Sequence, residues 1–423
     1  MDIERIRKMK LDKRYKIEEI NYARVGAMRL YDTSIKGLIK EIVLLFYFDF
    51  KVTYTHNSIN ERYLIYTLRN ANRLDYDEII DMFMETNPEF NKVEIIQIKT
   101  LENLHVKVIG LVKNFIRYLA KRVDNPLHIA LITTKYRILY NKLKKEAFLN
   151  NADMIITFCD AYPPDNLITQ IAKVNNIKTG TLQHGQYRIL SHGNENADAE
   201  AYENFISDYL FAWGQATVDE FIKVNISSNR LLKTGALRAF SRNKRVKFNL
   251  DNKVFGVVLC GETYSTTNIN MIKLANQFYH IYGLKYFLRM HPRNPQNKYL
   301  SYVTEGALFG YSNNISNDEY ARMIDFSLIH MTGVFVELLS MNTPIAIYKD
   351  SYLEEIFRID PYCVTSVEEL ASFYNTLLNN SETILNDQYS KYLYFNQPEN
   401  ELRKNYISAI NIITNKAKAK LII

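Results

Sequence analysis

A histidine flanked by two arginines is the first feature of this sequence that points to chemistry. His291 stands between Arg289 and Arg293, directly after the apolar residues 286–288. Guanidinium groups make paired, charge-assisted hydrogen bonds to phosphate oxygens, and an imidazole adds a further donor. The three side chains would suit a pocket that receives phosphate charge. A plain structural turn at His291 and Pro292 is the alternative.

Thr332 and Gly333 stand directly before an apolar run, 334–339, in which Glu337 is the charged exception. A helix that begins here would turn its free N–H groups and the positive end of its dipole toward a bound phosphate. A carboxylate among apolar neighbours needs polar partners, which a ribose diol would supply. The alternatives are an ordinary helix cap and a glutamate on a partly wet helix face.

Gly261 and Glu262 follow a third apolar run, 254–259. In a doubly wound sheet, ligands bind at the carboxyl ends of the parallel strands. We therefore expect Gly261 and Glu262 to converge with the segments around His291 and Thr332 on one nucleotide-binding site.

A second histidine, His184, ends an apolar stretch in the first half of the chain and is followed by Gly185. A histidine there could act as a general base on an acceptor hydroxyl. The acidic segment 192–203 comes next, could close over an acceptor and could supply a carboxylate base from Glu195 or Glu203. A buried or loop histidine and a solvated acidic loop are the alternatives.

Strand-length apolar stretches alternate with helix-like segments from about residue 128 onward, which is typical of βαβ units. In the first half we expect strands at 128–133, 154–158, 178–183, 209–214 and 230–235, with helices at 163–174 and 215–224. In the second half we expect strands at 254–259, 286–290, 326–331 and 344–348, with helices at 269–282 and 332–339. The expected class is therefore α/β.

The first 125 residues read as mainly helical, because 63–83 and 101–123 place apolar residues three and four positions apart. Short strands are expected at 51–54 and 93–98. We expect an acceptor-side domain over 1–237, a charged linker over 238–252 and a second, donor-binding domain over 253–400. A last helix over 401–423 could cross back onto the first domain.

Composition excludes several classes of protein. With 423 residues, 47% hydrophobic and 23% charged, the chain is long enough for two globular domains. Its three cysteines are too widely spaced for a disulfide framework or a zinc site, so we expect no metal and a reducing compartment. No signal peptide and no membrane span are expected, and the longest apolar run covers only 42–48. The expected location is cytoplasmic.

The net charge of +7 includes basic clusters at 142–145, 242–247 and 416–420. Each could be a solvated face, or it could attract phosphate or an anionic membrane at the inner face of the plasma membrane. No nucleic-acid module is recognisable and the clusters lack interleaved aromatics, so nucleic acid is not an expected partner.

Several of these motifs together resemble the bacterial GT-B glycosyltransferases of surface and capsular polysaccharide biosynthesis. Related patterns occur in sialyl- and Kdo-transferases and in CDP-glycerol glycerophosphotransferases. The resemblance covers about 150–350. It is carried by Leu182-Gln183-His184-Gly185, by Tyr209 to Gly214, by Lys233-Thr234-Gly235-Ala236, by Arg289-Met290-His291-Pro292, and by Thr332-Gly333 with Glu337 and Thr343-Pro344.

The resemblance implies two facing Rossmann-like domains, with a helical elaboration at the N-terminus. The first would bind a saccharide or lipid-linked acceptor, and the second a nucleotide-activated donor. It implies that Arg289 and His291 hold donor phosphate, that Thr332 and Gly333 do so through a helix N-terminus, and that Glu337 binds ribose. His184 matches the histidine of the His-Gly motif of the glycerophosphotransferases, which serves there as general base. Their tryptophan before that motif is Gln183 here, and the acidic pair plus glycine of the sialyltransferases is absent.

Retaining relatives carry two glutamates eight positions apart in the second domain, whereas Glu337 has isoleucines at both such offsets. We therefore expect an inverting, metal-independent glycosyltransferase that needs no cofactor besides its nucleotide-sugar substrate. Two alternatives stay open. One is transfer of glycerol or ribitol phosphate from a CDP donor, and the other is a catalytically silent nucleotide-binding subunit of a polysaccharide-assembly complex.

Overall fold

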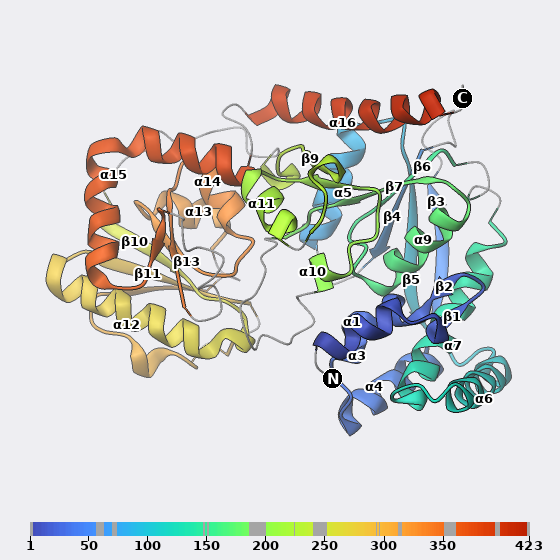
Figure 1. The fold of residues 1–423 in the computed structure, drawn as a ribbon. Helices are drawn as coiled ribbons and strands as arrows, with labels where there is room; N and C mark the ends of the chain where they lie inside the picture. Colours follow the sequence, from blue (N-terminus) through green and yellow to red (C-terminus); the bar gives the residue numbers. More distant parts are fainter. Residues whose placement is uncertain are drawn as a thin grey trace.

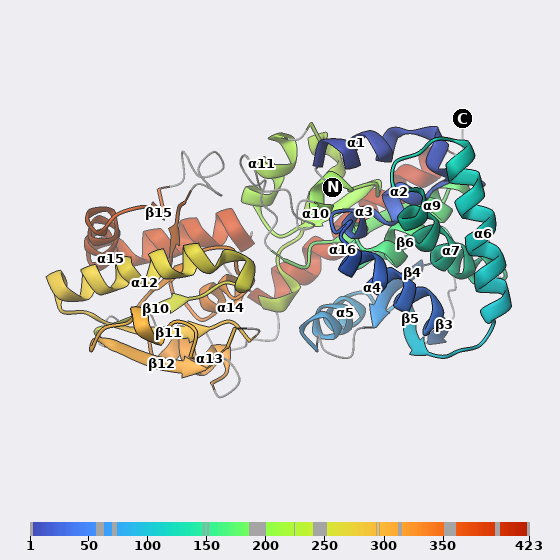
Figure 2. The same ribbon diagram turned by 90° about the horizontal axis from the view of Figure 1, so that it is seen from below.

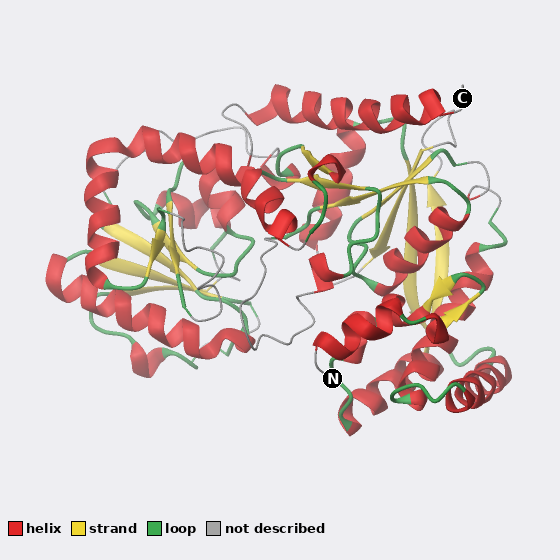
Figure 3. Cartoon of the chain, in the orientation of Figure 1, coloured by secondary structure: helices red, strands yellow, loops and turns green. Residues whose placement is uncertain are grey.

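Two separate β-sheets organise the chain, one in each half of the sequence (Figures 1 and 3). The structure is a computed structural model. It describes residues 3–55, 63–69, 74–146, 149, 152–185, 200–223, 225–239, 252–292, 294–295, 297–311, 315–350, 361–393 and 398–420. Both sheets are flanked by helices, and the fold is α/β with two Rossmann-like domains.

The second-half sheet has six parallel strands in the order β12-β11-β10-β13-β14-β15. The strands are β10 (Val254–Val258), β11 (Lys285–Met290), β12 (Ala307–Tyr311), β13 (Ser327–Ile329), β14 (Ile345–Tyr348) and β15 (Cys363–Val364). The helices are α12 (Ser265–Tyr282), α13 (Asn317–Arg322), α14 (Phe335–Ser340) and α15 (Val367–Gln388). The strand order reverses between β10 and β13, and ligands bind at such a point in doubly wound sheets. Four strands were predicted here, and β12 and β15 were missed.

The first-half sheet has seven strands in the order β3-β5-β4-β6-β7-β8-β9, parallel except for β3 against β5. The strands are β3 (Phe48–Thr55), β4 (Tyr63–Arg69), β5 (Asn91–Lys99), β6 (Met154–Thr157), β7 (Lys178–Leu182), β8 (Tyr209–Ala212) and β9 (Leu231–Lys233). The helices that follow its strands are α5 (Leu74–Thr86), α9 (Pro163–Val174), α10 (Glu200–Glu203) and α11 (Gln215–Lys223). The strands expected from 154 onward are confirmed.

The N-terminal segment is mainly helical, but it also contributes three strands to this sheet. Its helices are α1 (Ile3–Leu11), α2 (Tyr22–Val25), α3 (Ala27–Leu30), α4 (Ile35–Phe46) and α6 (Leu104–Ala120), with a small hairpin of β1 (Lys16–Ile17) and β2 (Ile20–Asn21). The helix expected over 63–83 was wrong at its start. Residues 63–69 form β4, which pairs on both sides with β5 and β6, and the helix begins only at Leu74.

The strand expected at 128–133 was also wrong, because these residues lie in helix α7 (Pro126–Leu143). Every side chain from His128 to Tyr136 is buried. A helix that is enclosed on all sides loses its polar stripe, and its sequence then cannot be distinguished by periodicity from a buried strand. Burial from both the sheet and the outer helices therefore explains the error.

Lys135 of α7 is a buried ammonium group, 4% exposed, with Nζ 5.1 Å from the centre of the Phe50 ring. Burial lowers the pKa of Lys135 from 10.5 to about 7. Between these values the unfolded chain binds a proton that the folded chain does not, so the free energy of unfolding must rise with pH across this interval. Urea unfolding should show higher stability at about pH 9 than at pH 7. Lys135→Met should stabilise the protein at pH 7 and flatten the rise.

The control is Lys273→Met, because Lys273 is an exposed lysine on α12. This variant should keep the slope of the parent protein. A Lys135→Met variant with an unchanged slope would mean that Lys135 titrates as a solvated lysine.

The last helix, α16 (Pro398–Lys420), lies along the first-half domain after the chain has passed through the second (Figure 1). The Tyr406 ring lies 6.0 Å from the ring of Phe83 and 5.7 Å from that of Phe211, with which it is stacked. Its hydroxyl donates to the carbonyl of Gly235 at 3.2 Å. α16 is therefore part of the first domain's core. Within the described ranges, no helix is both long and apolar enough to cross a bilayer.

Candidate functional site

Gly261 and His291 lie against each other at the carboxyl ends of β10 and β11. A Cβ atom added at Gly261 would stand 3.7 Å from His291 Cε1. The imidazole therefore packs directly against the backbone of Gly261. The structure thus brings together two residues that the sequence assigned to one site. Arg293, assigned to the same site, lies outside the described residues.

Two asparagines that the sequence reading missed hold these loops in place. The side-chain oxygen of Asn268 accepts from the backbone N–H of Cys260 at 2.8 Å, and its amide nitrogen donates to the Cys260 carbonyl at 3.0 Å. Asn294 Nδ2 donates to the same carbonyl at 2.9 Å, and its backbone N–H donates to the carbonyl of His291 at 2.9 Å. Because both are buried, the positions of Gly261 and His291 are fixed relative to each other.

The charged side chains of Arg289 and Glu262 are bonded to other groups of the protein. Arg289 is 5% exposed and donates to the Ile315 carbonyl at 3.0 Å and to Asn317 Oδ1 at 2.7 Å, which ties β11 to the start of α13. Burial lowers the pKa of its guanidinium. Glu262 forms an exposed ion pair with Lys298 at 2.8 Å. Both side chains brace the surroundings of His291.

Thr332 and Gly333 precede α14, but this helix starts at Phe335 rather than at 332, and it has only six residues. Thr332 and Gly333 thus lie just before the helix as expected, and 333 and 334 form the turn that leads into it. Thr332 Oγ1 accepts from the N–H of Val334 at 3.3 Å and closes that turn. The phosphate-binding argument from a helix dipole loses most of its force for so short a helix.

Glu337 forms an ion pair with Arg238, which was assigned to the linker and was not expected at the site. The Arg238 side chain is 12% exposed and that of Glu337 3%. A Cβ atom added at Gly333 would stand 3.0 Å from Arg238 Nη1, so the guanidinium lies over the turn before α14. The carboxylate expected to meet a ribose is thus met by an arginine from the other half of the chain.

His184 stands at the end of β7 inside a group of aromatic rings. Its ring centre lies 5.0 Å from that of Phe158, 5.5 Å from Tyr162 and 5.6 Å from Tyr76, and the hydroxyls of the two tyrosines are 3.0 Å apart. The imidazole is half-buried, and a Cβ atom added at the adjacent Gly185 would meet no described atom within 4 Å. His184 is therefore firmly positioned beside an open backbone segment.

Gln183, the residue before His184, joins the ends of two neighbouring strands. Its Nε2 donates to the Gly185 carbonyl at 2.8 Å, and its Oε1 accepts from the backbone N–H of Trp213 at 2.7 Å. The amide, 3% exposed, joins the end of β7 to the end of β8. It is a structural residue that shapes the His184-Gly185 turn.

Glu203 faces the N-terminal helix α1, where its carboxylate binds Arg7. Next to this pair, Lys10 and Glu200 form a buried ion pair of 2.9 Å, and Lys10 also donates to the Glu203 carbonyl at 3.2 Å. The carboxylate of Glu203 is therefore committed to holding α10 against α1. Glu195 lies outside the described residues.

The carboxyl ends of the two sheets meet through direct contacts. Trp213, which follows β8, places its ring 5.9 Å from that of Phe335 at the start of α14, and Arg238 reaches Glu337 two residues further on. Figure 1 shows α14 on the side of the second sheet that faces the first. Because Gln183 bonds to Trp213, a continuous set of contacts leads from the His184 turn to the turn at Gly333.

A buried polar network braces the same edge of the second sheet. His330, fully buried, has Nδ1 3.8 Å from Cys260 Sγ and Nε2 3.1 Å from Asp350 Oδ1, and Asp350 accepts from the Thr267 hydroxyl. Burial raises the pKa of the Cys260 thiol to about 12, so it is not a nucleophile at neutral pH. Among the residues that the structure describes, no three His, Cys, Asp or Glu side chains are grouped so as to hold a metal ion.

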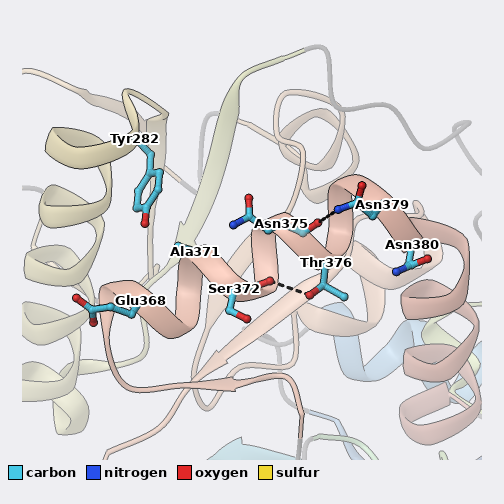
Figure 4. A pocket seen from close by; sticks show the side chains of 8 residues that line it. All are labelled: Tyr282, Glu368, Ala371, Ser372, Asn375, Thr376, Asn379 and Asn380. Atoms are coloured by element: carbon cyan, nitrogen blue, oxygen red, sulfur yellow. Dashed lines mark hydrogen bonds between the residues drawn. The ribbon is translucent and has the colours of Figure 1, made fainter.

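A polar hollow of about 460 Å³ lies elsewhere, between α12 and α15 (Figure 4). Tyr282 is the last residue of α12, whereas the β10 loop precedes its first turn, so the hollow is at the other end of this helix from Gly261. Thr376 and Asn379 donate to carbonyls of their own helix. The hollow is separate from the candidate site.

No protein-family model matches the sequence, and no curated protein matches it. Solved structures do match. The structure of S. aureus MnaA with UDP superposes with a TM-score of 0.50 and 12% identity, covering 84% of this chain and 97% of that one. A putative UDP-N-acetylglucosamine 2-epimerase from Listeria monocytogenes gives a TM-score of 0.51 and 13% identity over 83% and 96% of the two chains. At these identities the likeness concerns the fold, which is GT-B-like.

Proposed function

We propose that this protein is a glycosyltransferase that moves a sugar from a nucleotide-activated donor to a surface or capsular polysaccharide acceptor, with inversion and without a metal ion. The observation that carries the proposal is the meeting of the two carboxyl strand edges. One edge presents His184, and the other presents Gly261, His291 and the turn at Gly333.

On the donor side, His291 is the group that we propose to contact the diphosphate, with the Gly261 backbone leaving room beside it. Arg238 would add positive charge above Gly333, held there by Glu337. We therefore reassign Glu337 from a ribose ligand to a positioning residue for Arg238. Arg289, Glu262 and Thr332 would support the loops, since their polar groups have protein partners.

On the acceptor side, His184 would take the proton from the attacking hydroxyl. The hydroxyl oxygen forms the new bond to the anomeric carbon as the bond from that carbon to the nucleotide diphosphate breaks. The leaving diphosphate gains negative charge, which His291 and Arg238 would stabilise. Each group acts at a place fixed by buried neighbours, and such preorganisation is the main requirement of this kind of catalysis.

A nucleotide panel tests the donor assignment first. In a thermal-shift series with UDP, CDP, CMP, GDP and dTDP, we expect one nucleotide to raise the melting temperature. UDP is the first candidate because the two structural relatives are named for UDP or a UDP-sugar. His291→Ala should weaken binding of that nucleotide about tenfold, because a hydrogen bond to a charged group is lost.

His280→Ala is the matched control, since His280 is exposed near the end of α12. It should bind nucleotide like the parent protein. The donor assignment fails if no nucleotide shifts the melting temperature, or if the two histidine variants behave alike.

A second candidate is epimerisation of a UDP-sugar, which the fold likeness to the Listeria protein favours. Acceptor dependence separates the two reactions. A transferase consumes donor chiefly when an acceptor is present, whereas an epimerase converts UDP-N-acetylglucosamine alone. A parallel incubation with CDP-glycerol examines polyol-phosphate transfer.

A further inference from the structure

Two helices at the edge of the first domain expose apolar residues to solvent. The outward side chains of α6 are Val106, Val108, Ile109, Val112, Ile116 and Leu119, between 46% and 65% exposed. Those of α4 are Ile35, Ile39, Ile42 and Val43, between 38% and 79% exposed. We call these ten residues the α4/α6 face. Soluble proteins seldom expose so many neighbouring aliphatic side chains unless the surface binds something.

The α6 helix has its polar side inward, which is the reverse of an ordinary surface helix. Lys107 is 1% exposed, and its ammonium donates to the carbonyls of Phe46 and Phe48 at 3.3 and 3.2 Å. Asn114 donates to the hydroxyl of Thr134 of α7 at 2.9 Å. Hydrogen bonds to buried partners thus fix the rotation of α6 about its axis, and this rotation turns the apolar stripe outward.

The α4 helix shows the same inversion. Its inward Glu41 is 4% exposed and pairs with Arg29 at 3.3 Å, whereas Ile35 and Ile39 face solvent. Both helices pack on the buried α7 and lie along the lower edge of the first domain in the view of Figure 1, an edge that Figure 2 shows from below. The α4 and α6 helices are different elements from those that carry the candidate site, so docking through this face does not depend on the proposed function.

Basic residues accompany the α4/α6 face. Over 32–47 and 101–122 the exposed charged side chains are Lys36, Lys40, Lys113 and Arg122 against Asp32 and Glu102. Lysines keep their charge at a polar boundary while their stems lie on apolar surface. The face therefore combines aliphatic side chains with a positive surplus.

Of the basic clusters noted in the sequence, the structure describes side chains only in 142–145, and two of its lysines have partners within the first domain. Lys142 binds Asp49 at 3.0 Å and the Phe50 carbonyl at 2.7 Å, and Lys144 lies 4.0 Å from Glu18. The cluster at 242–247 lies outside the described residues, and so do the side chains at 416–420.

We propose that the α4/α6 face docks on an anionic lipid bilayer, with both helices lying in the headgroup region. The helices have 12 and 17 residues, and an outward aliphatic stripe with flanking lysines is typical of helices that lie in a membrane surface. Negative headgroups complement the positive surplus. A second copy docked face to face would bring these like charges together, which disfavours a dimer formed through this face.

Co-sedimentation with vesicles tests this docking. The full-length protein should bind vesicles of phosphatidylcholine and phosphatidylglycerol in equal parts, bind pure phosphatidylcholine less, and bind less in high salt. Ile109→Asp combined with Ile116→Asp should weaken binding about tenfold or more, because two charges would enter the apolar boundary. Ile281→Asp is the matched control, an isoleucine 61% exposed on α12, and should bind as the parent does.

Lys36→Glu with Lys40→Glu provides a second variant that changes no apolar residue. It should lose binding chiefly at low salt, and circular dichroism should show an unaltered melting curve for every variant. The proposal is overturned if the parent protein ignores anionic vesicles, or if Ile281→Asp loses as much binding as the double isoleucine variant. It is also overturned if sedimentation velocity without lipid reveals a dimer that Ile109→Asp with Ile116→Asp splits, while no vesicle binding is found.

Discussion

Replacing His184 by alanine should lower kcat about 10²–10⁴-fold, the range over which a positioned general base contributes. The imidazole packs against the rings of Phe158 and Tyr162, so it does not need to be ordered when the acceptor arrives. Removal of the ring leaves the β7–β8 bridge through Gln183 intact, and the fold should survive. The measurement is transfer kinetics with the donor that the nucleotide panel identifies.

Nucleotide binding gives the internal control for this variant. Calorimetry should show the same dissociation constant for His184→Ala and the parent protein, because the donor is proposed to bind the other domain. His280→Ala should keep both transfer and binding. If His184→Ala transfers sugar within a few-fold of the parent rate, the base lies elsewhere and the acceptor-side mechanism is wrong.

Glu337→Ala should destabilise the protein by about 3–5 kcal/mol, the usual cost of breaking a buried ion pair by removing one partner. The carboxylate is 3% exposed and Arg238 12%, so its loss leaves a guanidinium charge buried between the two halves. Arg238 Nε has no hydrogen-bond partner among the described residues. Once the carboxylate is removed, few protein groups are therefore left to bind the guanidinium. Urea unfolding gives the free energy directly.

The double variant Arg238→Met with Glu337→Leu separates charge from packing. It should regain most of the lost stability, since apolar side chains of similar size can replace a buried ion pair. Glu262→Ala, which removes one partner of the exposed pair with Lys298, should change the free energy of unfolding far less. Equal effects of Glu337→Ala and Glu262→Ala would show that the Arg238 pair is solvated.

The second-half sheet was the most predictable part of the fold. Its strands β10 and β11 are short, mainly apolar and separated by one long helix, so that length and periodicity agree. The same reasoning failed at 128–133, where burial on every side removed the polar stripe that identifies a helix. It failed again at 63–69, where a strand has aromatic and aliphatic residues at a spacing that a helix would share.

The sequence predicted only those contacts of the candidate site that follow from the arrangement of adjacent strands. Parallel strand ends share one edge, and this is enough to place Gly261 beside His291. The pairing of Arg238 with Glu337 joins residues 99 positions apart and depends on how two domains meet, which no local pattern encodes. Gln183 belongs to the same class, because its role depends on the backbone of Trp213, which follows the neighbouring strand.

The path of α16 limits how the two domains can move. The chain crosses from the first domain to the second between β9 and β10, and it crosses back between α15 and α16. The second of these connections leads into α16, whose Tyr406 stacks on Phe211 in the core of the first domain. Two covalent connections restrain the relative movement of the domains more than one would, because a movement must keep both pairs of joined ends within reach of each other. Rotation about the line that joins the two connections is the movement that they restrain least, and such a rotation would change the distance between the strand edges that carry His184 and His291.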